Sequence, residues 1–274
     1  MADEPEDPHE TDIYAPVRER PYRFIHFETV QGIARITLNR PPANVLSIDM
    51  MEDIVAALES LEYQREAKLI VFTAAGKYFS AGFELTDHLG DRGYVMLENF
   101  RKIFDLLFKL DKPTMAVVAG PAYGAGCILA VGCDLVIAAA SAKFVLHEIK
   151  AGVFNTVGAV VLPRLVGRKR AMEIILGGAS LSAAEAASLG LVSRVIPDDR
   201  VDAELALAIG RFQELSAPVL QLTRRAIVGA LDLPFADALT HAEDVYLNQL
   251  MATEDAEEGL RAVMAKRKPA WKDR

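Results

Sequence analysis

Cysteine, basic charge and long charge-free hydrophobic runs are all scarce in this sequence of 274 residues. Its two cysteines, Cys127 and Cys133, are too few for a disulfide framework and indicate a reducing compartment. Acidic side chains outnumber basic ones by 38 to 30, which gives a net charge of −8. This balance argues against general binding to nucleic acid or to an anionic membrane, although it is compatible with one small anionic ligand on a local basic patch.

Neither a leader peptide nor a membrane span is predicted. Residues 1–20 are acidic and contain proline, and no basic segment precedes an apolar one, so they predict a disordered tail and not a secretory signal. Residues 124–142 have almost the length of a membrane helix, roughly 20 residues, but Asp134 and three glycines interrupt them. We therefore expect a buried helix followed by a buried strand here, no membrane partner, and a cytoplasmic location.

The order of the expected elements predicts an α/β fold. The composition, with 51% hydrophobic and 25% charged residues, is that of a globular protein. Strand patterns occur at residues 22–30, 32–40, 69–73, 114–119, 135–139, 143–146 and 191–197. Helical patterns separate most of them, one at residues 158–166, and from residue 201 the pattern is helical almost to the end. A tight turn at Gln31-Gly32 is expected to join the first two strands. Ser47 can cap the helix that follows it, and Ser182 with Glu185 forms a capping box. We expect an α/β core over residues 21–200 and a helical region over residues 201–274.

Several common catalytic and binding motifs are missing. The stretch Gly124-Ala125-Gly126 has Leu129 where a dinucleotide-binding motif has its third glycine, and there is no Walker or G-x-S-x-G sequence. The chain has no C-x-x-C pair, and its histidines show no i, i+4 pairing; they are His9, His26, His88, His147 and His241. We therefore predict no nucleotide fold, no serine nucleophile and no metal site.

Two glycine-containing loops remain as candidates for chemistry. Residues 80–83 (SAGF) and 120–126 (GPAYGAG) each follow a predicted buried strand, and a helix is expected to start at the second loop. Free backbone N–H groups at such positions can hold an anion or a developing oxyanion, and each loop could give one N–H to a single carbonyl oxygen. Alternatively, the glycines serve only to make tight turns.

Four stretches carry a resemblance to a known family. They are NRPPANVLS from residue 39, KYFSAGFEL from residue 77, KPTMAVVAGPAYGAGCILAVGCDLVIAAASAKF from residue 112 and KRKPAWKDR from residue 266. Together they resemble motifs of the crotonase superfamily, the enoyl-CoA hydratases, isomerases and their relatives, over residues 24–274. The resemblance implies a spiral of ββα turns followed by a helical region that packs in a homotrimer, or in a homohexamer built of two trimers.

The resemblance also implies an activity. The substrate would be an acyl-CoA thioester, with coenzyme A as part of the substrate and no other cofactor. The thioester enolate would be stabilised by two backbone N–H groups, and the matching positions are Phe83 and Ala125. The same comparison suggests substrate contacts at Ala43, Ala81, Gly82, Tyr123, Gly124, His147, Asn155 and Thr156.

The acid–base positions of the family are only partly present. The first glutamate of the family's hydratases is replaced by Ile128, and a position that is acidic in the dehalogenase and dienoyl isomerase branches is Thr156. Glu148 is the one matching carboxylate. Because one base can move a double bond whereas hydration uses two positioned groups most easily, this pattern favours isomerisation.

Two other functions stay open. Residues 147–154 (HEIKAGVF), together with the PPANVL and GFELTDH stretches, resemble the cyclic dienoyl-CoA hydratases. Ile128 and Thr156 also fit an acyl-CoA-binding homologue that has lost its chemistry.

Other polar residues have structural alternatives. Asp134 is expected to bond a buried turn, Glu84 to make a structural hydrogen bond, and His147 either to orient Glu148 or to be exposed. Tyr123 either lines the acyl pocket or packs in the core. Basic residues that could meet the CoA phosphates are Arg40, Lys266, Lys268 and Lys272.

Overall fold

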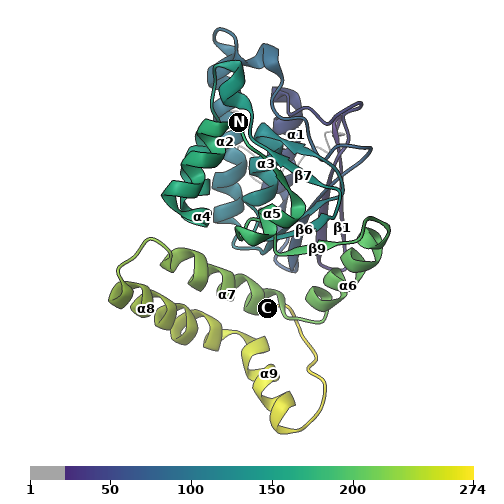
Figure 1. The fold of residues 1–274 in the computed structure, drawn as a ribbon. Helices are drawn as coiled ribbons and strands as arrows, with labels where there is room; N and C mark the ends of the chain where they lie inside the picture. The colour runs from purple at the N-terminus through teal and green to yellow at the C-terminus, as the bar shows by residue number, and fades with distance from the viewer. Residues whose placement is uncertain (1–21) are drawn as a thin grey trace, which may run out of the picture.

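The computed structural model describes residues 22–274, so the predicted tail lies outside the described residues. The strands are β1 (Ile25–Val30), β2 (Ile33–Leu38), β3 (Leu69–Ala74), β4 (Thr114–Val118), β5 (Ala122–Tyr123), β6 (Leu135–Ala139), β7 (Lys143–Val145), β8 (Ser180–Ser182) and β9 (Arg194–Ile196). The helices are α1 (Ile48–Ser60), α2 (Arg92–Lys109), α3 (Gly124–Val131), α4 (Thr156–Gly177), α5 (Ala183–Ser188), α6 (Val201–Gln213), α7 (Ala217–Ala230), α8 (Phe235–Asp244) and α9 (Glu254–Met264). Figure 1 shows the strand-containing body with α7, α8 and α9 below it.

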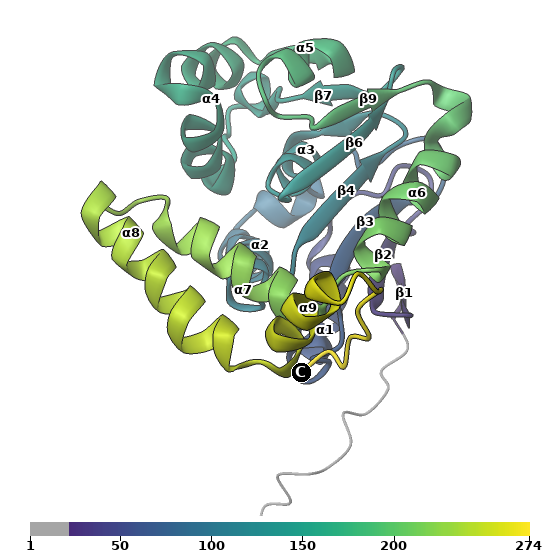
Figure 2. The same ribbon diagram turned by 90° about the horizontal axis from the view of Figure 1, so that it is seen from below.

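The main sheet has six strands in the order β1-β2-β3-β4-β6-β9, as the view in Figure 2 displays. Only β1 and β2 run antiparallel, and they are joined by the predicted tight turn, where Gln31 and Gly32 both have positive φ angles. All later neighbours in this sheet are parallel. Parallel strands with helical crossovers explain why β3 and β4 are apolar except for one threonine each, because both faces are covered.

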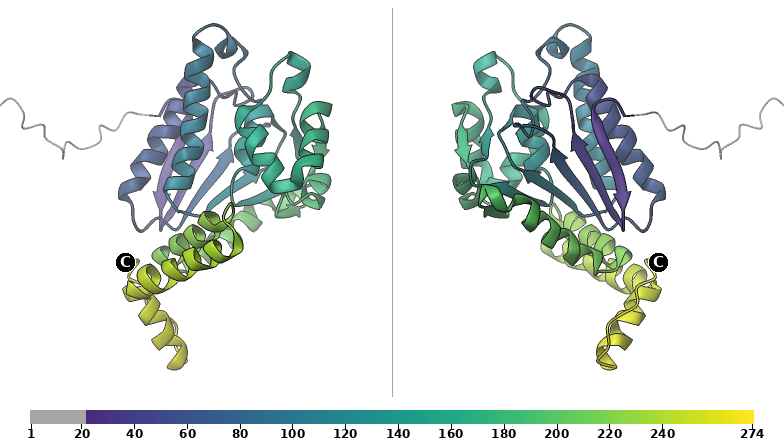
Figure 3. Two further views of the ribbon diagram at one scale, coloured as in Figure 1. Left: turned by 90° about the vertical axis from the view of Figure 1, so that its left-hand side faces the viewer. Right: turned by 90° about the vertical axis from the view of Figure 1, so that its right-hand side faces the viewer.

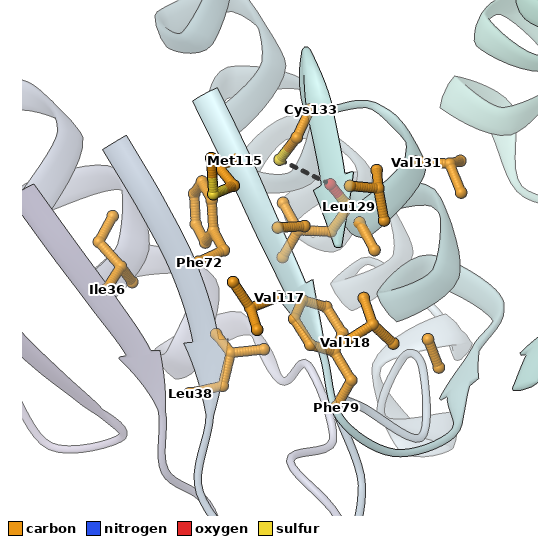
Figure 4. Packing of buried hydrophobic residues seen from close by; sticks show 14 of the residues in the cluster. Ile36, Leu38, Phe72, Phe79, Met115, Val117, Val118, Leu129, Val131 and Cys133 are labelled. Atoms are coloured by element: carbon orange, nitrogen blue, oxygen red, sulfur yellow. Dashed lines mark hydrogen bonds between the residues drawn. The ribbon is translucent and has the colours of Figure 1, made fainter. Parts of the chain in front are cut away.

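Helix α1 shows how the sequence pattern becomes a buried face. Ser47 caps it by accepting a hydrogen bond from the Met50 backbone N–H, and Met50, Ile54 and Leu58 are fully buried at helical spacing. The core of the body continues through Phe72, Met115 and Leu129, which are among the buried residues labelled in Figure 4. The core therefore fixes the ends of β3 and β4, from which the two glycine loops begin.

The segment that resembled a membrane helix is part of this core. Helix α3 is buried along its whole length and leads through Asp134 into β6, as predicted. Cys133 donates a hydrogen bond from Sγ to Leu129 O (3.4 Å), shown dashed in Figure 4. Both cysteines are buried and free, and burial raises the pKa of each thiol. Among residues 22–274, no helix has both the length and the apolar sequence that a membrane span requires.

Some predicted boundaries were wrong. The strand expected at residues 191–197 is confined to β9, because Leu191 and Val192 are buried in the turn after α5. The helix expected at 158–166 extends to Gly177, with a kink at Gly167, which has φ 75°. The short strands β5 and β8 were missed; they flank β7 in a second, three-stranded sheet. Two or three residues are too few to give an alternating pattern.

The C-terminal helices extend away from the body. The side views of Figure 3 show α7 and α8 lying side by side at one end of the molecule, with α9 beyond them. Large apolar side chains on α7, α8 and the turn between them are exposed, including Ile227, Leu231 and Phe235. A helical region follows β9 as expected, although the division of the chain at residue 200 stays a prediction.

Candidate active site

Two loops are tied together by Asn44, which the sequence reasoning did not select. Its side chain is buried; Nδ2 donates to Ala75 O (2.8 Å) and Tyr78 O (2.9 Å), and Oδ1 accepts from Arg40 N (2.8 Å). The signal available in the sequence was a polar residue between the apolar residues Ala43 and Val45, whereas its positive φ angle is seen only in the structure. Asn44 therefore holds the loop after β3 in place against the loop after β2.

The Phe83 N–H is left free by the way its loop is paired. Leu46 N donates to Gly82 O (2.8 Å), and Glu84 N donates to Leu46 O (3.1 Å), so this pairing skips Phe83 N. Ala81 N donates to Ala43 O (2.8 Å), which is the role the structure gives to Ala43. Gly82 has φ 91°, a conformation that favours glycine. In the described part of the chain, we find no acceptor for the Phe83 N–H.

The second candidate donor, Ala125 N, lies at the start of α3. Ala125 is the second residue of this helix, and first-turn N–H groups have no partner within the helix. A β-carbon placed on Gly82 would lie 3.7 Å from Ala125 N, so the two loops are in contact. Gly126 also has to be glycine, because its β-carbon would approach Ser80 Cβ to 2.4 Å. These glycines therefore both make tight turns and allow the two loops to approach each other closely.

Glu148 reaches the same place from the second sheet. It begins the short 3-10 helix η3 (Glu148–Ala151) just after β7, and β7 pairs with β5, which leads into α3. A β-carbon on Gly124 would lie only 2.8 Å from Glu148 Oε1, so the carboxyl group packs against the backbone at the N-terminus of α3. Oε1 is buried without a hydrogen-bond partner among the described residues, and burial raises the pKa of the Glu148 carboxyl group.

The other acid–base positions carry no charge. Ile128 is fully buried, and its Cδ1 atom would lie 2.9 Å from a β-carbon on Gly158 in the first turn of α4. Thr156 is exposed at the beginning of α4, and Asn155 caps that helix by accepting from Gly158 N (2.7 Å). Ile128 therefore acts as a packing residue between α3 and α4.

A cavity of about 430 Å³ lies beside Phe83. Its walls come from η2 (Leu85–His88), from α2 and from the segment before α4, and its side chains include Phe83, His88, Tyr94, Met96, Leu97, Phe154 and Thr156. The His88 and Phe83 rings meet edge to face at 5.7 Å. Apolar walls with few polar groups suit an acyl chain. His88 and Tyr94 were not selected from the sequence, because nothing in their spacing indicates that they face a shared cavity.

The remaining predicted residues fall into two groups. Five of them lie around the two loops and Glu148, namely Ala81, Gly82, Tyr123, Gly124 and His147. The rings of Tyr123 and His147 meet edge to face at 5.5 Å, and His147 is exposed. Arg40 instead pairs with Glu84 (3.1 Å), and Lys272 pairs with Glu254 (2.7 Å). Asp134 bonds Thr114 and Arg224, the structural role that was expected.

Two loops that present backbone N–H groups beside a half-buried carboxyl group form the kind of site that can act on an acyl carbonyl group. The model of the enoyl-CoA hydratase/isomerase family matches residues 28–274, so the chain belongs to this family and to the crotonase superfamily. A probable enoyl-CoA hydratase of Rhizobium meliloti is 37% identical over 92% of this chain and 99% of its own. One of Mycobacterium tuberculosis is 34% identical over 92% of this chain and 99% of its own. The crystal structure of an enoyl-CoA hydratase from Mycobacterium smegmatis superposes with TM-score 0.85 at 30% identity, covering 91% of this chain and 99% of that one.

Proposed function

We propose that the chain shifts the double bond of an enoyl-CoA thioester through an enolate. Phe83 N–H and Ala125 N–H would donate to the thioester oxygen, and Glu148 would move the proton. The observation that carries this proposal is the position of Glu148 Oε1 over Gly124, next to the first turn of α3. One carboxylate, buried enough to raise its pKa, is suited to take a proton from one carbon and return it to another.

The acyl group would extend from the thioester into the cavity beside Phe83. The oxygen gains negative charge only as the α- or γ-proton leaves, so the two N–H groups stabilise the enolate more than the bound substrate. Loss of one such donor typically costs about 2.7–4 kcal/mol of transition-state stabilisation. Ala43, Ala81 and Gly82 would contact the thioester side, and Tyr123, Gly124, His147, Asn155 and Thr156 would surround the carboxyl group.

The test is proton exchange in deuterated water. The protein is incubated separately with a 3-enoyl-CoA, a 2-enoyl-CoA and a cyclic dienoyl-CoA, and the products are analysed by mass spectrometry. We expect deuterium in the product and a shifted double bond, both nearly abolished in Glu148→Gln and unaffected in Glu173→Gln, an exposed glutamate on α4. Full activity of Glu148→Gln would disprove the role of Glu148.

Two other functions are outcomes of the same experiment. Water addition to the 2-enoyl-CoA or to the cyclic dienoyl-CoA would identify a hydratase, the activity in the names of the relatives. Tight binding of all three esters without exchange would identify an acyl-CoA-binding homologue, which the uncharged Ile128 and Thr156 favour.

We also propose that the protein forms a homotrimer, or a homohexamer of two trimers. A cavity of about 590 Å³ lies between α7 and the edge of the body, with mostly apolar walls that include Leu220, Ile227 and Trp271. It holds none of the residues of the candidate active site, and together with the exposed apolar face of α7 and α8 it fits contact with another copy. A cytoplasmic location stays a prediction.

A further inference from the structure

Two buried polar atoms without partners face one small cavity behind the candidate base. They are Glu148 Oε1 and Asn155 Nδ2, and neither forms a hydrogen bond with any of residues 22–274. Both residues line the same small cavity, whose other side chains are apolar, including Leu146, Phe154 and Leu162. A buried polar atom without a partner lowers stability, so two of them in one cavity require an explanation.

The orientation of the Asn155 amide is fixed by the helix that it caps. Its Oδ1 accepts from Gly158 N at 2.7 Å, so Nδ2 must point in the other direction. Asn155 is only 6% exposed. Gly158 lies between Asn155 and Ile128, and a β-carbon on Gly158 would have no room there. Nδ2 is therefore held as a hydrogen-bond donor that faces the cavity.

The two atoms do not bond directly, but the cavity that both residues line has room for one water molecule. About 10 Å³ of this cavity is open to the centre of a water molecule, close to the minimum for a single one. A water there would accept from Asn155 Nδ2 and donate to Glu148 Oε1, which removes both unpaired atoms. The other side chains of the lining are apolar, so Glu148 and Asn155 are the two side chains that can bond to this water.

We propose that Asn155 is a positioning residue, which acts through one buried water molecule on the Glu148 carboxylate. The water donates to the ionised form of Glu148, so it favours that form and opposes the effect of burial on the pKa. It also fixes Oε1, so the orientation of the carboxyl group toward the substrate is set from behind. The catalytic meaning of this contact rests on the proposed function, whereas the contact itself does not.

Few charged groups surround this contact. The titratable side chains that act on Glu148 within the described residues are His147, the preceding residue, and Cys127 from α3. The Cys127 thiol stays neutral, because burial raises its pKa. Lys150, on the same turn as Glu148, packs instead against Gly178 at the end of α4. The α4 side of the cavity contributes Asn155 and apolar groups, so the amide is the polar group available there.

The test measures the pKa of Glu148 directly. The protein is labelled with carbon-13 at its glutamate carboxyl groups, the Glu148 signal is assigned from its loss in Glu148→Gln, and its pKa is followed by NMR. Asn155→Ser keeps an oxygen that can cap α4 but removes the amide, and we expect the pKa of Glu148 to rise by about one unit. Asn155→Asp also caps the helix but adds a negative charge, and we expect a larger rise.

The outcomes separate this inference from the proposed function. If Asn155 only caps α4, the pKa of Glu148 stays at its wild-type value in Asn155→Ser, and the inference is wrong. Asn155→Asp raises this pKa through its charge in either case and serves as the control that the two side chains are close. A crystal structure of the wild-type protein should contain a water within hydrogen-bond distance of both atoms; a dry cavity would also overturn it. Neither measurement needs turnover, so an absence of activity on enoyl-CoA esters would count against the function alone. If turnover is found, the acid limb of kcat should move upward in pH by the same amount as the NMR value.

Discussion

The Glu148 carboxyl group packs directly against the backbone of Gly124. A β-carbon on residue 124 would lie only 2.8 Å from Glu148 Oε1, so this contact requires glycine. Gly124 also has φ 50°, in the region that L-residues with a side chain avoid. One glycine therefore determines both the entry into α3 and the position of the candidate base.

Gly124→Ala should abolish most activity. The methyl group must displace the Glu148 carboxyl group, and a displacement of about 1 Å at a reacting group can lower the rate about 100-fold. Gly190→Ala is the matched control, because Gly190 also has a positive φ angle but nothing lies within 4 Å of its β-carbon position. Initial rates and thermal melts of both variants give the comparison. Equal losses of activity would mean that backbone strain, and not contact with Glu148, is responsible.

Stability should depend on pH through Glu148. Burial raises its pKa above the ordinary 4.5, so its favourable contribution to folding is complete below about pH 4.5 and is lost as the pH rises through the raised value. Glu148→Gln cannot ionise, so its free energy of unfolding should increase relative to the wild type between pH 4 and pH 8. Urea unfolding across this range measures the difference. Glu173→Gln should show no such trend, and a trend equal in both variants would contradict the assignment to burial.

Asn44→Ala should weaken both the fold and the site. It removes hydrogen bonds to two carbonyl oxygens and one N–H group, and we expect a loss of about 3 kcal/mol of unfolding free energy. Activity should fall as well, because the loop that presents Phe83 N–H is no longer held. Asn44→Gly allows the positive φ angle but lacks the amide, so it separates backbone strain from hydrogen bonding. Glycine restoring full stability would show that the amide is unimportant.

Asp134→Ala should destabilise the body without affecting chemistry directly. Its carboxylate accepts from Thr114 N (2.7 Å) and Arg224 Nε (2.8 Å), and Arg224 is largely buried. Leaving this guanidinium unpaired should remove about 2–3 kcal/mol of stability, less than a fully buried pair because Asp134 is partly exposed. Chemical denaturation measures this loss. Glu173→Ala breaks the exposed pair with Arg170 and should change the stability by well under 1 kcal/mol.

The exposed apolar face of α7 and α8 should mediate self-association. Leu231 is 72% exposed and Phe235 is 84% exposed in the single chain. Light scattering should give about three or six times the 29.9 kDa mass of one chain. Leu231→Asp with Phe235→Glu should shift the protein to smaller species, whereas Tyr63→Glu, on an exposed residue outside the C-terminal helices, should not. A wild-type protein that is monomeric at all concentrations would refute the trimer.

The sequence predicted the elements whose signals are local. The cap at Ser47, the buried α3–β6 segment and the capping box at Ser182 with Glu185 were confirmed, since each depends on residues a few positions apart. Short strands such as β5 and β8 were missed, because they are set by pairing with β7 across the fold.

Within the site, the residues that motifs mark were predictable and those that packing selects were not. Phe83, Ala125 and Glu148 came from the glycine loops and the family resemblance, and their catalytic roles stay predictions. Asn44 and His88 depend on which segments meet in space, so single-sequence patterns do not reveal them. The partner of Asn155 Nδ2 is likewise visible only once α4 is placed beside η3.

Because Gly82, Gly124 and Gly126 are closed to larger residues, the two N–H donors are encoded by main-chain shape. Their strength cannot be tuned by exchanging side chains at these positions, so variants with new substrate preferences must arise elsewhere. In a saturation library, tolerated changes should concentrate in the cavity walls at positions such as Tyr94, Leu97 and Phe154. The glycine positions beside the two N–H donors are therefore constrained in sequence, whereas the positions in the cavity walls can vary.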